Sequence, residues 1–100
     1  MSVLCVHLQD GFDGDLVIIR MNGAEWARRP NVMTQPFLGH AEFVDLPKLT
    51  EGNIRLDVSL PKRGLDQSAT VPGPGDTFVA ANVEDGRLQL SISNQLHGCM

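Results

Sequence analysis

The sequence lacks several features that would point to particular classes of protein. It has only eight lysine and arginine residues among 100, scattered along the chain, and a formal net charge of −4. Nucleic-acid binding depends on clustered basic side chains that neutralise phosphates, so this charge argues against a nucleic-acid partner. No apolar run approaches the roughly 20 residues that a membrane-spanning helix requires. We therefore expect a protein that binds neither nucleic acid nor membrane.

A secretion signal and a catalytic motif are also missing. Residues 1–8 alternate in polarity and have no basic segment ahead of an apolar one, so we expect no signal peptide and a cytoplasmic protein. No serine lies in a Gly-x-Ser-x-Gly turn. The 72–75 segment lacks the lysine and the following helix of a phosphate-binding loop. Catalytic triads can be dispersed in sequence, but no residue pattern here indicates an enzyme.

Only two cysteines are present, Cys5 and Cys99, and they lie near opposite ends of the chain. A structural zinc site requires pairs of closely spaced ligands, which this spacing does not supply. In a reducing cytosol, two free thiols are the expected state. A disulfide that ties the terminal segments together is the alternative.

The residues that are present indicate β-structure, most clearly between positions 77 and 93. Asp85-Gly86 favours a two-residue type I′ turn, in which both residues have positive φ. The register that this turn sets places Glu84 opposite Arg87. It also brings the apolar side chains to one face: Val79, Ala81, Val83, Leu88, Leu90 and Ile92. Polar residues occupy the other face, so the pattern predicts a β-hairpin with one buried side.

A second hairpin is predicted at Asn22-Gly23, another dipeptide that favours a two-residue turn. The strand before it, residues 16–21, is apolar on both faces, and such a strand is normally covered on both sides. The turn predicts these pairs: Met21 with Ala24, Arg20 with Glu25, Ile19 with Trp26 and Ile18 with Ala27. The second strand should end near Arg28, because Pro30 removes a hydrogen-bond donor. Residues 30–39 are then expected to form a long loop.

Further strands are predicted in four places: residues 3–9, 41–46, 54–60 and 68–71. No segment has the apolar spacing of a helix. About seven short strands separated by turns predict a single small antiparallel β-sandwich with Greek-key connections, of the immunoglobulin-like or prealbumin-like kind. The sandwich would span residues 1–100, with 94–100 as a tail. We expect six residues in its core: Leu56, Val58, Val79, Val83, Leu90 and Ile92.

Two stretches between residues 16 and 60 each contain a further recognisable feature. The first is Leu-Val-Ile-Ile-Arg-Met-Asn-Gly at 16–23, and the second joins Phe-Val-Asp-Leu-Pro at 43–47 to an alternating strand after Gly52. They resemble a strand and turn, and a later Leu-Pro turn, of transthyretin-like (prealbumin-like) domains, which include carboxypeptidase regulatory-like and PEGA-type modules. The resemblance implies an accessory, binding or scaffolding module without catalysis. This group is usually extracytoplasmic, so the missing signal peptide is a departure from it.

The 10–15 segment is the candidate metal site. Asp10, Asp13 and Asp15 lie within six residues together with two glycines, and calcium prefers several hard oxygen ligands. The spacing is not that of an EF-hand loop. The alternative, which the turn preference of aspartate favours, is that these carboxylates accept hydrogen bonds from nearby backbone N–H groups.

Ile18 and Trp26 are the candidate interface residues. The second apolar face of the 16–19 strand needs cover from the 30–38 segment, from the 94–100 tail or from another copy of the chain. Trp26 opposite Ile19 favours core packing, but an outward Trp26 would be an interface anchor. Twofold pairing is the commonest arrangement of identical chains. We therefore expect a homodimer with Ile18 or Trp26 in or near its interface.

These patterns predict a non-enzymatic β-sandwich interaction or binding module without a cofactor, whose partner is another protein or a second copy of itself. The alternative is a small-ligand or calcium-binding domain that uses the acidic loop 10–15 or the loop 30–40.

Overall fold

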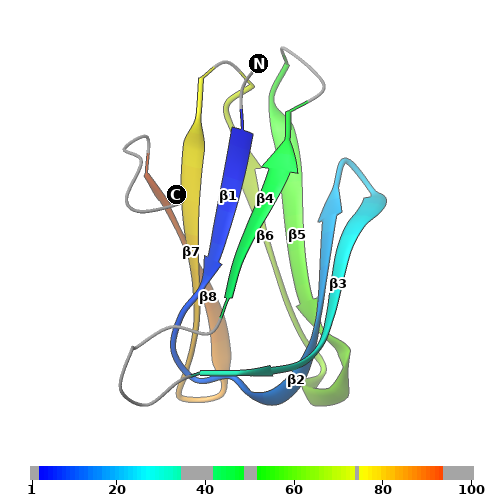
Figure 1. Cartoon of the computed structure of the whole chain (residues 1–100), viewed down its shortest axis with the longest axis vertical. Helices are drawn as coiled ribbons and strands as arrows, with labels where there is room; N and C mark the ends of the chain where they lie inside the picture. The colour runs from blue at the N-terminus through cyan, green and yellow to red at the C-terminus, as the bar shows by residue number, and fades with distance from the viewer. Residues whose placement is uncertain (1–2, 35–41, 49–51, 74, 94–100) are drawn as a thin grey trace.

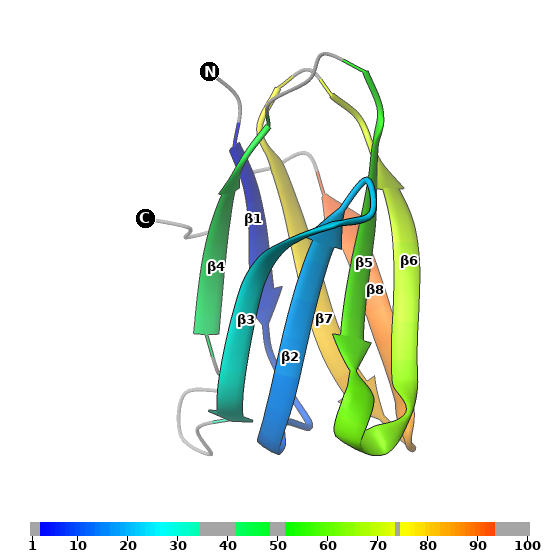
Figure 2. The same ribbon diagram turned by 90° about the vertical axis from the view of Figure 1, so that its right-hand side faces the viewer.

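The computed structural model describes residues 3–34, 42–48, 52–73 and 75–93. Eight strands form two four-stranded sheets that pack as a sandwich (Figure 1). Sheet A has the order β4-β1-β7-β8, and sheet B, nearer the viewer in Figure 2, has the order β3-β2-β5-β6. The strands are β1 (Val3–Leu8), β2 (Asp13–Met21), β3 (Ala24–Met33), β4 (Glu42–Pro47), β5 (Ile54–Leu60), β6 (Leu65–Val71), β7 (Thr77–Glu84) and β8 (Arg87–Ser93).

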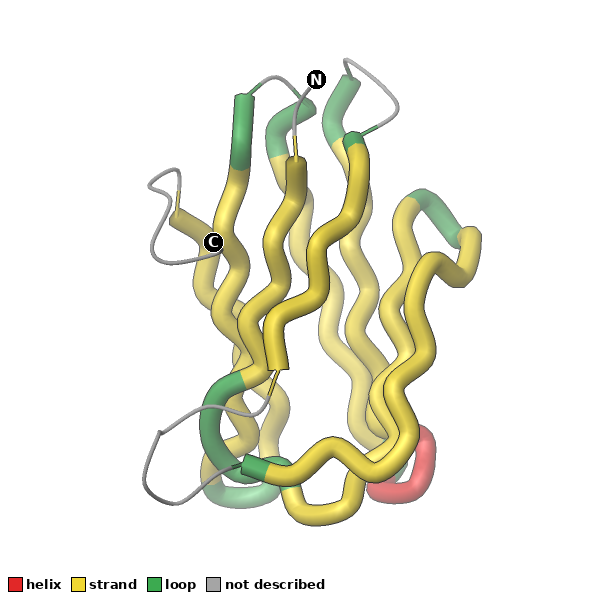
Figure 3. Tube along the Cα trace, viewed as in Figure 1, coloured by secondary structure: helices red, strands yellow, loops and turns green. Residues whose placement is uncertain are grey.

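A single turn of 3₁₀ helix, η1 (Pro61–Arg63), connects β5 to β6 at one end of the sandwich (Figure 3). It was not expected from the sequence, where the segment after residue 60 reads as a turn. Pro61 supplies a fixed φ at the start of η1, and Gly64 ends it in the left-handed conformation. Within the described residues, no helix is long and apolar enough to cross a membrane.

The core lies between the two sheets and is built from alternate residues of nearly every strand. Sheet A contributes Leu4, Val6, Leu8, Val44, Leu46, Val79, Ala81, Val83 and Leu88. Sheet B contributes Val17, Ile19, Met21, Ala27, Val32, Ile54, Leu56, Val58, Leu60 and Val71. Burying one Val, Leu or Ile side chain stabilises the fold by roughly 1.5–3 kcal/mol. Burial of Leu56, Val58, Val79 and Val83 confirms four of the six predicted core residues.

The all-β sandwich is confirmed, but the prediction of a purely antiparallel fold is wrong. β1 pairs antiparallel with β4 on one side and parallel with β7 on the other. A parallel pair needs a long crossover connection between its strands. Here that connection contains β2 to β6, so the pairing joins distant segments and leaves no mark on the local pattern of either.

The β7–β8 hairpin has the predicted register, including Glu84 opposite Arg87 and Val79 opposite Ile92. Asp85 and Gly86 both have positive φ, as a type I′ turn requires. The predicted burial of Ile92 is wrong, since its side chain is 41% exposed, and Leu90 is only partly buried. Both residues lie on β8, an edge strand, which has a neighbouring strand on one side only.

The β2–β3 hairpin follows the predicted register only next to its turn. Arg20 pairs with Glu25, but Ile19 pairs with Ala27 rather than with Trp26, because a register shift falls between Ile19 and Arg20. Such a β-bulge inserts one extra residue into one strand. The predicted pairs for Ile19 and Ile18 are therefore wrong by one position on β3.

The predicted end of β3 near Arg28 is also wrong, because the strand continues to Met33 through Pro30. β3 is an edge strand of sheet B, where a proline can point its missing N–H group away from the sheet. Residues 30–33 thus belong to a strand rather than to the predicted loop. Residues 35–41 of that loop lie outside the described residues, as does the 94–100 tail.

Cys5 is fully buried in β1 and is disulfide-bonded. The expectation of two free thiols is therefore wrong. The only other cysteine of the sequence, Cys99, lies outside the described residues. Disulfides persist mainly in oxidising compartments. The cytoplasmic location, which was expected from the absence of a signal peptide, stays a prediction.

Candidate functional site

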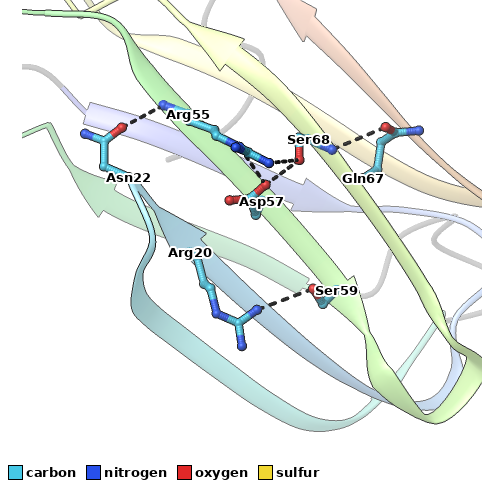
Figure 4. Close-up of polar contacts among 7 residues, drawn as sticks. All are labelled: Arg20, Asn22, Arg55, Asp57, Ser59, Gln67 and Ser68. Carbon is cyan, nitrogen blue, oxygen red and sulfur yellow. Dashed lines mark hydrogen bonds and ion pairs between the residues drawn. The ribbon is translucent and has the colours of Figure 1, made fainter.

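A shallow polar groove lies on the outer face of sheet B, the face turned away from the core. Its cavity has a volume of about 250 Å³. It is lined by one residue of β2, three of β5 and two of β6: Arg20, Arg55, Asp57, Ser59, Asp66 and Ser68. Figure 4 shows five of these side chains, all but Asp66. We call this cavity the sheet B groove.

Strand alternation and register bring these six side chains together. The apolar partners in each strand point into the core, so the residues between them point outward. Arg20 on β2 is opposite Asp57 on β5, which is opposite Ser68 on β6. These three residues form one row across the sheet. Ser59 and Asp66 are opposite each other in the next row.

Arg55 and Asp57 form an ion pair at one side of the groove, with 3.3 Å between Arg55 Nε and Asp57 Oδ1. Ser68 completes this cluster: its hydroxyl donates to Asp57 Oδ1 and accepts from Arg55 Nη2 at 3.4 Å. The backbone N–H of Arg55 donates to Asn22 Oδ1 at 2.9 Å, which attaches β5 to the β2–β3 turn (Figure 4). Arg55, Asp57 and Ser68 are therefore partners of one another at this side of the groove.

Arg20 is engaged much more weakly. Its Nη1 donates to Ser59 Oγ across a long 3.4 Å contact, and within the described residues it forms no ion pair. Arg20 also acts on its neighbour in β3: the pKa of Glu25 is lowered mainly by its hydrogen bond with Arg28, and to a smaller extent by the charge of Arg20. Among the described residues only Ser59 accepts a hydrogen bond from this side chain, so most of the guanidinium N–H groups of Arg20 are left for a ligand.

Of the four charged residues that line the groove, Asp66 is the second that forms no ion pair with a described residue. It lies on the exposed edge strand β6, diagonally across the groove from Arg20. The floor of the groove consists of the half-buried Arg20, Asp57 and Ser59, and its rim consists of exposed residues. The lining includes hydroxyls and carboxylates but no His, Cys or Lys. This donor and acceptor set suits reversible binding of a polar group.

The three aspartates proposed as calcium ligands have different hydrogen-bond partners. Asp15 is buried and is held by two hydrogen bonds from Arg63. Its Oδ2 also accepts the backbone N–H of Asp13 at 2.9 Å, a local bond of the kind the turn alternative describes. The backbone N–H of Asp10 instead donates to Asn82 on β7. Among the described residues, no three His, Cys, Asp or Glu side chains are grouped so that they could hold a metal ion.

The two candidate interface residues lie in different environments. Ile18 is only 6% exposed, although it faces outward between Arg28 of β3 and Ser59 of β5. Trp26 lies at the bulge of β3 and is 40% exposed. Core packing of Trp26, which the predicted pairing with Ile19 favoured, is therefore wrong.

Sequence reasoning missed Lys48, which is buried next to the end of β4. Its Nζ donates to the carbonyl oxygens of Pro72 and Gly75 and to Thr77 Oγ1, at 2.8, 2.6 and 2.7 Å. Burial lowers the pKa of Lys48, and the charge of Asp76 partly offsets this effect. All three donors are used within the chain, so Lys48 fixes the turn before β7. No local sequence signal marks a lysine for this role.

Fold and groove together define a small β-sandwich domain with a polar surface on one sheet. No protein-family model, no curated protein and no solved structure matches the chain. The resemblance to transthyretin-like domains therefore has no support from a family match and stays a prediction.

Proposed function

We propose that the protein is a non-catalytic binding module and that the sheet B groove is its binding site. The observation that supports this proposal most directly is that six polar side chains from β2, β5 and β6 line one cavity. Side chains held by regular strands need little rearrangement to meet a ligand, and preorganised sites bind at a lower cost in conformational entropy. The half-buried Arg20, with unused donors, supplies a strong hydrogen-bonding group at the floor.

The two-sheet architecture agrees with the accessory and binding roles that the transthyretin-like resemblance implies. Membership of that group, Greek-key connections and a cytoplasmic location stay predictions. Calcium binding at Asp10, Asp13 and Asp15 has weaker support, since Arg63 already neutralises Asp15. Of the 30–40 segment proposed as an alternative binding loop, residues 30–34 are described, and 30–33 of these belong to β3.

Thermal unfolding with a panel of polar small molecules tests the proposal, because a ligand that binds only the native state raises the melting temperature. The panel contains neutral sugars, amino acids, phosphate, acetate and calcium ions. We expect at least one member to raise the melting temperature of the wild-type protein but not that of Arg20→Gln. The proposal fails if no member does so, or if the rise is the same in both proteins.

Self-association through β3 is a second candidate function, and the exposure of Trp26 supports it. Trp26 is exposed on an edge strand, and tryptophan is enriched at the energetic centres of protein interfaces. Ile18 is already buried within the chain, so an interface would be centred on Trp26. We expect light scattering at micromolar concentration to detect a dimer that Trp26→Ser dissociates and that Ile92→Ser, at an equally exposed residue of the other sheet, does not. A wild-type monomer would rule out this candidate.

A further inference from the structure

The charges that line the sheet B groove cancel. It contains two arginines, Arg20 and Arg55, and two aspartates, Asp57 and Asp66. An anion drawn to Arg20 would also meet the repulsion of the carboxylates, and a cation drawn to Asp66 would meet that of the guanidinium groups. The groove is therefore better matched to a ligand without net charge than to an ion of either sign.

The hydrogen-bonding groups of the lining alternate in kind. Arginine only donates, ionised aspartate only accepts, and serine does both. Three adjacent strands each present one of these groups to the groove: Arg20 on β2 is a donor, Ser59 on β5 both donates and accepts, and Asp66 on β6 is an acceptor. A hydroxyl group both donates and accepts, so neighbouring hydroxyls on one ligand can satisfy all three.

The dimensions of the groove limit the ligand to a small group. Its volume of about 250 Å³ lies below the range of roughly 300–1,000 Å³ that is usual for pockets of drug-sized ligands. This space suits one ring bearing several hydroxyls, either free or as one unit of a longer chain that extends over the open rim.

We infer that the sheet B groove binds a neutral polyhydroxylated ligand, namely a saccharide. This inference rests on the proposed function of the groove and adds the chemical class of its ligand. Arg20 donates to one hydroxyl, Asp66 accepts from another, and Ser59 lies between them. The Arg55–Asp57–Ser68 cluster forms the adjoining wall of the groove.

Saturation-transfer NMR with individual probes tests this inference. The sugar probes are glucose, galactose, mannose and N-acetylglucosamine, and the charged probes are acetate, a methyl phosphate ester and glycine. The decisive comparison uses two variants that change the charge of the groove in opposite directions, Arg20→Gln and Asp66→Asn. Arg87→Gln is the matched control, because Arg87 is an exposed arginine on the other sheet.

A neutral sugar should lose affinity in both groove variants, by about tenfold each, since each removes a hydrogen bond to a charged group. Its affinity should be unchanged in Arg87→Gln. It should also persist at about 1 M salt, where the Debye length is only about 3 Å and ionic attraction is screened.

Binding of acetate or the phosphate ester that weakens in Arg20→Gln but strengthens in Asp66→Asn would overturn the saccharide inference and leave the binding function of the groove intact. Salt-sensitive binding of glycine that weakens in both variants would do the same. If no probe binds, or if both groove variants bind sugar as the wild type does, the saccharide inference fails. In the former case the binding function of the groove has failed with it.

Discussion

The guanidinium of Arg63 holds the carboxylate of Asp15 through two hydrogen bonds, 2.8 Å from Nε to Oδ1 and 2.7 Å from Nη2 to Oδ2. Nη2 also donates to the carbonyl oxygen of Gly11 at 3.0 Å. This bidentate pair joins η1 to the start of β2 and to the segment before it. An aspartate whose sequence context suggested a metal ligand thus has a partner within the chain.

Arg63→Met should lower the free energy of unfolding by about 2 kcal/mol, because the buried Asp15 would lose its counter-charge. The loss should be smaller than the 3–5 kcal/mol typical of breaking a fully buried pair, because the side chain of Arg63 is 32% exposed and solvent screens the interaction. Urea unfolding measures this difference. Lys62→Met, at an exposed neighbour in η1, should cost under about 0.5 kcal/mol. Equal losses in the two variants would contradict a specific role for Arg63.

Lys48→Met should cost about 1–3 kcal/mol, because three acceptors near the turn before β7 would lose their donor. Thr77→Val removes only one of these acceptors and should cost less.

The contribution of Lys48 to folding stability should depend on pH with a defined sign. Since the folded-state pKa of Lys48 lies below 10.5, the unfolded state binds more protons as the pH approaches 10.5, and folding stability rises with pH there. The wild type should gain stability relative to Lys48→Met as the pH rises from neutral toward 10.5, and a constant difference would contradict this account.

Gly11→Ala should be far more damaging than Gly86→Ala. Both glycines have positive φ, but a Cβ at Gly11 would lie 2.0 Å from the carbonyl oxygen of Val83, whereas a Cβ at Gly86 meets nothing within 4 Å. We expect a loss of about 3 kcal/mol or more at Gly11, from backbone strain and collision together. At Gly86 the loss should be about 1 kcal/mol, from the backbone conformation alone. Similar melting temperatures for the two variants would contradict the close approach of Gly11 to the carbonyl oxygen of Val83.

Leu56→Ala should lower the free energy of unfolding much more than Ile92→Ala, because Leu56 lies in the closed core and Ile92 at its open edge. Leu56 is fully buried in β5, so its truncation should cost about 2–5 kcal/mol. Ile92 keeps much of its side chain in solvent, and its truncation should cost about 1 kcal/mol. Denaturant unfolding of both variants compares the two values directly, and a loss at Ile92 as large as that at Leu56 would place it in the core after all.

The turns of both hairpins and the register of β7 with β8 were predictable from sequence because their information is local. Asp85-Gly86 fixes its turn, and alternation identifies the buried face of β7, but burial fades toward the end of the edge strand β8. The same reasoning fails at Trp26, because a bulge depends on how two whole strands accommodate each other rather than on a dipeptide. Pro30 misleads for a related reason: it ends a strand only if that strand has neighbours on both sides, and β3 does not.

The groove was only partly visible in the sequence. Alternation already assigns Arg55, Asp57 and Ser59 to the outward face of their strand. It does not reveal that Arg20 and Ser68 belong to the strands on either side, since strand order is a property of the assembled sheet. Lys48 is hidden more completely, because its three acceptors lie at least 24 residues away along the chain.

Mapping of amide chemical shifts tests most directly whether the sheet B groove is the binding site. Labelled protein would be titrated with the sugar or other panel member that gives the largest rise in melting temperature. The account predicts that the shifted amides cluster on the adjacent segments of β2, β5 and β6 around Arg20, Asp57 and Ser68, and that the outer face of sheet A is unaffected. Shifts concentrated at residues 10–15, or spread over both sheets with no focus on the groove, would contradict it.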